Sequence, residues 1–384
     1  MNVAAAILSR SMASLRAEWR PLTATEPIEA AWRALAARAL EPNVFYEPAF
    51  VRAAAPVFGP DAGVGLVWSQ DGMLAGVFPA RIERRYGLPL PVLTGWTHPF
   101  APLGTPLVAR DAADAVISAW LDHVASDPGL PGLTLWPLIP DGAFARTLAT
   151  VLARRRDPIA TFGRHQRALL APGDPRAGYL EQTIGAKKRK ELRRQRHRLG
   201  DLGAIEIDAV TEVAAIRHAL GAFLDLEARG WKGRAGTAAA HDAAVRRFVE
   251  DVVAGLAAEH KARIDRLRVA GRAVATIVTL RSLDTAWTWK IAYDEDFARF
   301  SPGVQLMLDV TESLLADPGV ARADSCADPG HPMIDHLWRE RLALSDHLIA
   351  VRPQRLGFPL VCRLERLRRS AIAGAKTLRN RLRG

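Results

Sequence analysis

The chain has 384 residues, of which 49% are hydrophobic and 24% charged, and its formal net charge at pH 7 is +11. This composition argues against extended disorder, and the length allows two domains that each bury a core. Two cysteines, Cys326 and Cys362, exclude a disulfide framework, and no run approaches the 18 apolar residues of a membrane-spanning helix. Residues 1–15 do not have the pattern of a secretory signal, so we expect a cytoplasmic protein.

The first half of the chain predicts a mixed α/β domain at residues 26–172, after an N-terminal extension at 1–25. Its expected helices lie near 28–40, 48–57 and 112–126, and its expected strands near 64–69, 73–81 and 132–136. The tripeptide Gln70-Asp71-Gly72 separates two apolar runs and is typical of a β-hairpin.

The second half predicts a further α/β domain at residues 173–352. Its expected elements, in chain order, are a strand at 204–210, helices at 212–228 and 238–260, strands at 263–270, 273–281 and 285–293, a helix at 302–316 and a strand at 320–326.

The strand expected at 285–293 carries a candidate site. Alternate residues of a strand share a face, which would place Trp287, Trp289, Ile291 and Tyr293 on one side and Thr288, Lys290, Ala292 and Asp294 on the other. The aromatic side would pack, and Lys290 and Asp294 would line a cleft or lie on a solvated face.

The helix that follows this strand has the start of an anion site. Ser301 is a good N-cap and Pro302 a good first helical residue. The first turn should therefore offer free backbone N–H groups and the positive end of the helix dipole to a phosphate.

Two further segments are candidates for ligand contact. In Trp231-Lys232-Gly233-Arg234, the aromatic ring and the cations suit a phosphate or carboxylate, although Gly230 could simply cap a helix on which Trp231 packs. The cluster of Asp328, His331, Asp335 and His336 could supply a general base, hold a metal ion or form a structured turn.

Positive charge is concentrated in two helical segments. Residues 185–200 contain eight Lys or Arg and one acid, and their helix, at 187–198, could be solvated or could bind a membrane, cofactor phosphates or a nucleic acid. Residues 353–384 contain nine Lys or Arg and one acid. Their apolar residues form one helical stripe, consisting of Leu356, Leu360, Leu364, Leu367, Ala371, Ala375, Leu378 and Leu382. This pattern predicts an amphipathic helix that lies on an anionic membrane or docks on its own domain.

Several of these blocks resemble the GNAT acyltransferases, in particular the two-domain branch labelled CelD/BcsL-like, which is related in fold to the FemAB peptidyltransferases. The resemblance rests on 31–35 with 43–50, the basic stretch 187–194, the segment 226–237 and the region 290–305, and it extends over most of residues 30–350. It implies an α/β (α+β) fold of two tandem GNAT-like domains with mixed central sheets flanked by helices.

The resemblance also implies the roles of the candidate residues. Acyl-CoA would be bound through Arg299, Ser301, Gly303, Val304 and Gln305, and the acceptor through Trp231, Lys232 and Arg234. Catalysis would fall to Lys290, Asp294 and the cluster of Asp328, His331, Asp335 and His336, without a metal ion.

From these features we expect an acyl-CoA-dependent N- or O-acyltransferase that acts on a cell-envelope component, such as an exopolysaccharide sugar or a long-chain lipid amine. The protein would lie on the inner face of the membrane through residues 353–384. Two alternatives remain: FemAB-like aminoacyl transfer from charged tRNA, with 187–198 as the nucleic-acid contact, and a non-catalytic accessory role in polysaccharide biosynthesis or export.

Overall fold

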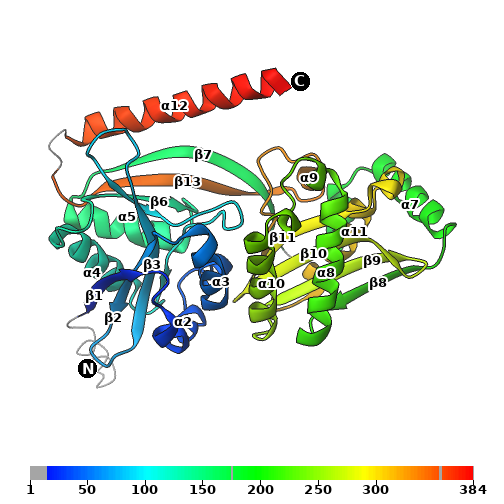
Figure 1. The fold of residues 1–384 in the computed structure, drawn as a ribbon, viewed down its shortest axis with the longest axis horizontal. Helices are drawn as coiled ribbons and strands as arrows, with labels where there is room; N and C mark the ends of the chain where they lie inside the picture. Colours follow the sequence, from blue (N-terminus) through cyan, green and yellow to red (C-terminus); the bar gives the residue numbers. More distant parts are fainter. Residues whose placement is uncertain (1–14, 174–175, 354–356, 384) are drawn as a thin grey trace. The chain divides into compact units, whose positions relative to one another are not determined.

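The computed structural model describes residues 15–173, 176–353 and 357–383 (Figure 1). The chain divides into two compact units. The first unit contains the residues up to Asn43, Gly59–His165 and the residues from Ala343 onward, and the second contains Val44–Phe58 and Gln166–Leu342. The units therefore differ from the two contiguous segments expected from the sequence, because residues 44–58 and 166–172 fall in the second unit and residues 343–352 in the first.

The first unit is a mixed sheet with helices against it. Its strand order is β1-β2-β3-β4-β6-β13, with β5 paired to β3. Its elements are β1 (Arg16–Pro21), α2 (Glu29–Ala36), β2 (Gly63–Trp68), β3 (Leu74–Glu83), β4 (Val92–Gly95), β5 (Leu107–Val108), α4 (Ala113–Ser126), β6 (Leu133–Leu138), α5 (Ala143–Arg155), β13 (Glu340–Ala350) and α12 (Phe358–Arg383), with a 3₁₀ turn at η1 (Glu26–Ile28).

The hairpin predicted at Gln70-Asp71-Gly72 is confirmed by the antiparallel pairing of β2 with β3. The N–H of Ser69 donates to the carbonyl of Met73 at 2.9 Å, and Gly72 has a φ of 79°, a conformation that glycine adopts without strain. The strands β1, β4, β5 and β13 and the helix α5 were not predicted.

The second unit has the strand order β7-β12-β11-β10-β9-β8. Its elements are η2 (Val44–Tyr46), α3 (Pro48–Phe58), the part of β7 (Ile159–Leu170) that begins at Gln166, α6 (Tyr179–Thr183), α7 (Ala186–Gly200), β8 (Ile205–Val210), α8 (Val213–Arg229), α9 (Trp231–Arg234), η3 (Ala239–His241), α10 (Ala243–Ala257), β9 (Ala262–Val269), β10 (Arg272–Ser282), β11 (Thr285–Tyr293), η4 (Glu295–Phe300), α11 (Pro302–Ala316), β12 (Arg322–Asp324) and η5 (Ile334–His336). The predicted bounds of β11 and α11 are confirmed, whereas the strand predicted at 320–326 is shorter.

The segment with η2 and α3 belongs to the second unit because its side chains are buried there. Phe50 packs edge-to-face on Phe248 of α10, with ring centroids 5.6 Å apart. Glu47, which is buried, accepts from the hydroxyl of Ser282 at 2.6 Å and from the ammonium group of Lys261 at 2.9 Å. These contacts tie the segment to the sheet of the second unit.

A β-bulge in β11 places some of its side chains on a different face of the sheet from the predicted one. The pairing of β10 with β11 shifts by one residue, because Val278 pairs with Lys290 and Thr279 with Thr288, so that Trp289 is the extra residue of β11 at the bulge. Trp287 and Trp289 contact Phe45 and Phe50, as predicted for one face, but Ile291 and Tyr293 pack in the core beneath α11 on the other face. The prediction that all four residues share a face is therefore wrong.

Candidate functional site

The strands β11 and β12 diverge and leave an opening in the second unit. They pair in parallel at three positions only, from Thr285 with Arg322 to Trp287 with Asp324. After this point β12 ends, while β11 continues to Tyr293. One edge of β11 between Thr288 and Tyr293 is therefore not covered by β12.

The exposed edge of β11 offers backbone groups to a ligand. Asp294 donates its N–H to Val274 on the β10 side. Since successive residues of a strand point their N–H and C=O groups to alternate sides, those of Ile291 and Tyr293 point to the side that β12 leaves. The carbonyl of Ile291 accepts from the ammonium group of Lys232 at 3.3 Å, which is consistent with this direction.

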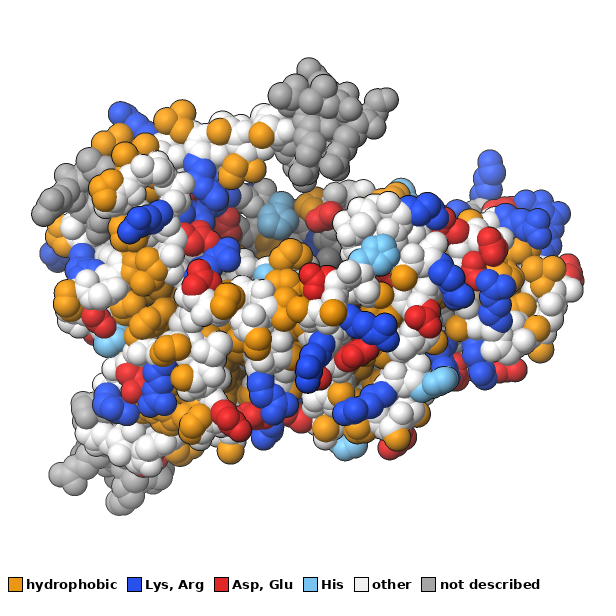
Figure 2. All heavy atoms as spheres, in the orientation of Figure 1, with side chains coloured by type: hydrophobic (Ala, Val, Ile, Leu, Met, Phe, Trp, Pro, Cys, Tyr) orange, Lys and Arg blue, Asp and Glu red, His pale blue; other side chains and the backbone are white. Residues whose placement is uncertain are grey.

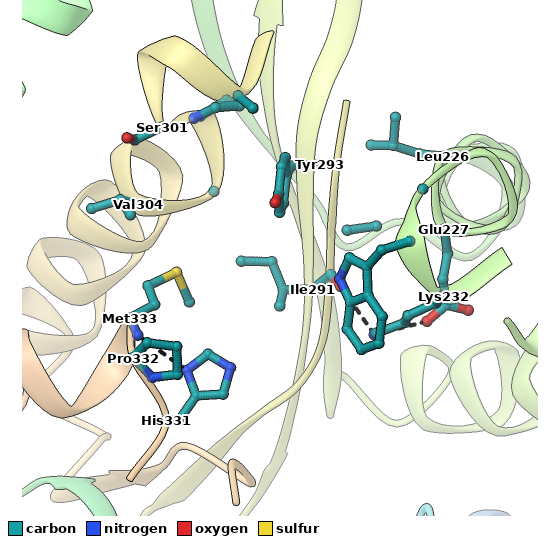
Figure 3. Close-up of a pocket in the computed structure, with 16 residues that line it drawn as sticks. Leu226, Glu227, Lys232, Ile291, Tyr293, Ser301, Val304, His331, Pro332 and Met333 are labelled. Atoms are coloured by element: carbon teal, nitrogen blue, oxygen red, sulfur yellow. Dashed lines mark hydrogen bonds and ion pairs between the residues drawn. The ribbon is translucent and has the colours of Figure 1, made fainter. Parts of the chain in front are cut away.

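A pocket of about 500 Å³ opens at the end of this edge (Figure 3). Its walls come from four parts of the chain: the end of α8 with α9, the last residues of β11, the start of α11, and the loop 331–333. In Figure 3, Ile291 and Tyr293 lie between the α11 side, with Ser301 and Val304, and the α8 side, with Leu226 and Glu227.

The first turn of α11 forms one wall of the pocket. Pro302 occupies the first helical position, as predicted, and the N–H groups of Gly303 and Val304 lie in the turn that has no intrahelical acceptors. Ser301 precedes the helix in a left-handed conformation, with a φ of 51°, and its side chain makes no capping hydrogen bond. The prediction of a hydroxyl cap is therefore wrong, although the helix start is as expected.

Gly303 allows α11 to lie close to β11. A Cβ atom added at Gly303 would lie 3.4 Å from Cδ1 of Tyr293 and 3.5 Å from Cδ1 of Ile291. A side chain larger than a methyl group would therefore extend into the pocket beside these two residues.

The opposite wall is formed where α8 ends and α9 begins. The chain bends at Gly230, and Gly233 is required at the bend because an added Cβ would overlap the carbonyl of Ala228. Glu295 fixes α9 to the end of β11, since it accepts from the N–H of Trp231 and from Arg234, both at 2.6 Å. Trp231 remains 54% exposed at the pocket, so it does not pack as a helix staple.

Glu227 holds two lysines at the pocket, and the sequence analysis did not select it as a site residue. One carboxylate oxygen of Glu227 lies 3.0 Å from Nζ of Lys290 and 3.0 Å from Nζ of Lys232. The other oxygen accepts the N–H of Ala239 at 3.0 Å. The side chains of Glu227 and Lys290 are 1% and 9% exposed, whereas that of Lys232 is 26% exposed.

Burial and the neighbouring opposite charges shift the pKa values of Glu227 and Lys290 in opposite directions. Burial raises the pKa of Glu227, but the two ammonium groups and the N–H of Ala239 together lower it further, so the pKa of Glu227 lies below its ordinary value. Burial also lowers the pKa of Lys290, Lys232 adds to this, and Glu227 opposes it. Glu227 is therefore ionised at neutral pH and is a weak base.

The predicted cluster near His331 does not converge on the pocket. Only His331 lines the pocket, while Asp328 and His336 are exposed on the surface and Asp335 belongs to the short turn η5. Nδ1 of His331 accepts from the N–H of Met333 at 3.3 Å. A neutral imidazole with this acceptor keeps its proton on Nε2, so His331 is a hydrogen-bond donor to a ligand in this arrangement.

Six of the predicted site residues line the pocket, namely Trp231, Lys232, Ser301, Gly303, Val304 and His331. The others lie outside it. Asp294 caps η4 and pairs with Arg272, the side-chain amide of Gln305 donates to the carbonyl of Leu192 at 2.8 Å, and the guanidinium group of Arg299 stacks on Phe300. Arg234 pairs with Glu295, and Lys290 lies behind Glu227.

Within the described ranges, no three His, Cys, Asp or Glu side chains converge as metal ligands. In the same part of the chain, no helix combines the length and apolar character needed to cross a membrane.

Comparison with known proteins identifies the domain that contains the pocket. Residues 186–330 match the family model described as an acetyltransferase (GNAT) domain. These residues form a GNAT domain. All residues that line the pocket lie within or directly after the matched range, and the resemblance seen in the sequence is confirmed. No curated protein matches the sequence significantly.

Solved structures resemble most of the chain in fold. FemX has a TM-score of 0.54 at 9% identity, and the match covers 83% of this chain and 95% of FemX. The C-terminal domain (DUF2156) of a putative lysylphosphatidylglycerol synthetase from Agrobacterium fabrum has a TM-score of 0.52 at 12% identity, covering 85% of this chain and 92% of that domain. A conserved protein of unknown function from Bacteroides thetaiotaomicron has a TM-score of 0.52 at 10% identity, and the match covers 84% of this chain and 96% of that protein. These matches confirm the α/β fold class.

Proposed function

We propose that the second unit transfers an acyl group from the thioester of acyl-CoA to an amine. The observation that supports this is the convergence, on one pocket, of the uncovered edge of β11 and the first turn of α11. The edge supplies N–H groups for a carbonyl, and the helix start supplies N–H groups for a phosphate.

The donor would extend from α11 along β11. The N–H groups of Gly303 and Val304 and the dipole of α11 would bind the pyrophosphate of CoA. The N–H of Ile291 would then donate to the thioester carbonyl, which develops negative charge during attack. The ammonium group of Lys232, which already lies at the carbonyl of Ile291, would stabilise the same charge.

The proposed transfer needs no covalent intermediate between the acyl group and the enzyme. The nitrogen of the acceptor forms a bond to the thioester carbon, the carbon–sulfur bond breaks, and a proton from the nitrogen ends on the sulfur. Nε2–H of His331 would donate a hydrogen bond to the leaving sulfur, and the proton that the sulfur takes up comes from the attacking nitrogen. A neutral amine attacks a thioester without prior deprotonation, whereas a hydroxyl needs a base, and Glu227 is a weak one because of its lowered pKa. The pocket therefore favours an amine over a hydroxyl acceptor.

The acceptor would be an amine of a cell-envelope component. Much of the pocket lining is apolar, with contributions from Leu226, Ile291, Val304 and Met333, and this supports a long-chain lipid amine over an exopolysaccharide sugar. The similarity in fold to a domain of a putative lysylphosphatidylglycerol synthetase supports a lipid as the acceptor, but not the choice of an amine, because the acceptor group of phosphatidylglycerol is a hydroxyl.

Aminoacyl transfer from charged tRNA is a second candidate, and the surface of α7 favours it. Lys187, Lys188, Lys190, Arg193 and Arg198 of α7 are exposed. Glu191, the only acid in residues 185–200, is paired with Arg194. Figure 2 shows the blue side chains gathered over α7 at the right of the view. A surface of this kind attracts a nucleic acid as well as the phosphates of CoA.

The two donors are separated by a transfer assay with purified protein. Acetyl-CoA, palmitoyl-CoA and a lysyl-tRNA are offered in turn, together with sphinganine or glucosamine, and the acylated product is measured by mass spectrometry. We expect product from an acyl-CoA with an amine acceptor, and a large loss of kcat in the variant Lys232→Met. Product from the lysyl-tRNA alone would favour the second candidate, and no product from any donor would favour the non-catalytic accessory role.

A further inference from the structure

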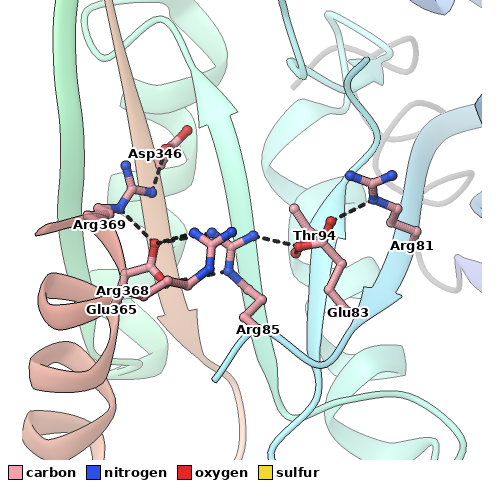
Figure 4. A network of polar contacts seen from close by, with 8 residues as sticks. All are labelled: Arg81, Glu83, Arg85, Thr94, Asp346, Glu365, Arg368 and Arg369. Atoms are coloured by element: carbon pink, nitrogen blue, oxygen red, sulfur yellow. Dashed lines mark hydrogen bonds and ion pairs between the residues drawn. The ribbon is translucent and has the colours of Figure 1, made fainter. Parts of the chain in front are cut away.

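The helix α12 docks on the first unit through a polar network (Figure 4). Glu365 of α12 is fully buried and accepts from Arg85 at 3.1 Å and from Arg369 at 2.7 Å. Arg369 also donates to Asp346 of β13 at 2.6 Å. The apolar side chains of Val361 and Cys362 are buried on the same side of the helix. These contacts define the docked face of α12.

The apolar stripe predicted from the sequence lies on a different face. With 100° between successive helical residues, Leu360, Leu364, Leu367 and Ala371 lie about 140° around the axis from Val361, Glu365 and Arg369. Leu360 is 41% exposed and Leu367 is 67% exposed. Leu356 lies outside the described residues, as do the side chains of Leu378 and Leu382. The helix therefore docks on its own unit and still presents its described stripe to solvent.

Cations flank the exposed stripe. Arg363 lies on one side of the stripe and Arg368 on the other, each about 70° from its centre. Arg363 is exposed, whereas Arg368 is 33% exposed and lies 3.8 Å from Glu365. Arg363 and Arg366 are exposed, and Glu365, the only acid of α12, is neutralised on the docked face. Figure 2 shows orange hydrophobic side chains beside blue cations on the outer surface of α12.

We propose that the exposed stripe of α12 binds an anionic lipid surface. Two leucines in a narrow stripe enter the apolar part of a headgroup layer, and arginines on both sides reach the lipid phosphates. A nucleic acid would use the arginines but would leave Leu360 and Leu367 in water. This inference concerns the first unit and does not depend on the reaction proposed for the second.

The test uses substitutions in the stripe of the full chain. Deletion of α12 is unsuitable because it would expose Arg85 and the apolar surface beneath Val361. In Leu360→Gln/Leu367→Gln, the two changed side chains lie on the exposed face, so the docked face is intact. The matched control is Ala373→Gln, since Ala373 is also exposed but lies away from the stripe.

Binding is measured by flotation with vesicles of phosphatidylcholine, with or without phosphatidylglycerol. We expect wild type and Ala373→Gln to float with the phosphatidylglycerol vesicles and to bind less as salt is added. The stripe variant should bind at least about tenfold more weakly, because each buried leucine contributes roughly that factor.

Two results would overturn the proposal. One is equal flotation of the stripe variant and wild type. The other is wild type that does not float but forms dimers which the stripe substitutions dissociate, because the stripe would then bind a second copy of the chain. Arg363→Gln/Arg366→Gln provides an independent check, since loss of charge should reduce the binding to anionic vesicles without changing the melting temperature.

Discussion

The substitution Glu227→Gln tests the electrostatics of the pocket most directly. It keeps the volume of the side chain but removes the charge that neutralises Lys290 and Lys232, both 3.0 Å away. Lys232 is 26% exposed and can turn its ammonium group to water, whereas Lys290 is 9% exposed and cannot. The substitution therefore leaves mainly Lys290 as a buried charge without its counterion Glu227. We expect the region around Lys290 to be destabilised by about 3 kcal/mol, as for a broken buried ion pair.

The expected dependence on pH follows from the two pKa shifts. The pKa of Glu227 is lowered from 4.5, so its contribution to stability in wild type is present above that pH and is lost as the pH falls through the lower, folded value. In the variant, Lys290 lacks its counterion, and burial lowers its pKa further below 10.5. A lysine with a lowered pKa costs stability while it is charged, so the variant should regain stability as the pH rises from neutrality toward 10.

Hydrogen–deuterium exchange of peptides from β10 and β11 measures this effect within the second unit. A loss of about 3 kcal/mol corresponds to roughly 100-fold faster exchange for amides that exchange through local opening. The double variant Glu227→Gln/Lys290→Met should exchange more slowly than Glu227→Gln, because no uncompensated buried charge remains. If Glu227→Gln leaves exchange unchanged at neutral pH, or if adding Lys290→Met makes exchange faster still, the reasoning is refuted.

Three further predictions concern the ligand. Gly303→Asp should weaken CoA binding at least about tenfold in calorimetry, because its carboxylate would lie at the proposed phosphate position. The uncharged Gly303→Asn should weaken CoA binding less. Equal CoA affinities of Gly303→Asp and wild type would show that the phosphate does not bind at α11. His331→Ala should lower kcat by about 10²-fold with little change in CoA affinity. His336→Ala, at an exposed position outside the pocket, should retain wild-type activity. A loss of kcat in His336→Ala but not in His331→Ala would assign the catalytic role to His336. Gln305→Ala should lower the melting temperature, because the carbonyl of Leu192 loses its hydrogen bond. The affinity for CoA should not change at a temperature where the protein is folded. A loss of CoA affinity at that temperature would show that Gln305 contacts the ligand.

The strand and helix that form the pocket could be predicted because their signals are local. The run of aromatic and β-branched residues from Thr285 to Tyr293 is typical of a strand, and Pro302 marks the first residue of a helix. The bulge at Trp289 could not be predicted in the same way, since it depends on the register between β10 and β11. A shift of one residue there exchanged the faces of Ile291 and Tyr293, which turned two residues expected on the aromatic side into part of the pocket.

Glu227 shows why the central charge of the site was missed and how it could have been found. Its partner Lys290 lies in a strand far along the chain, so the ion pair is not visible in any local pattern. One signal was present in α8, however, where the buried face runs through Ile216, Leu220 and Phe223 at helical spacing and reaches Glu227 as its next member. A glutamate in line with a buried apolar face requires a cation or several N–H donors, because an unpaired buried carboxylate is too costly. The lysines at 232 and 290 were already candidates, so the rule that buried charges are paired would have connected all three residues. The same rule applies to Glu365 on α12, where a lone acid among eight cations indicates the docked face of the helix better than the apolar stripe does.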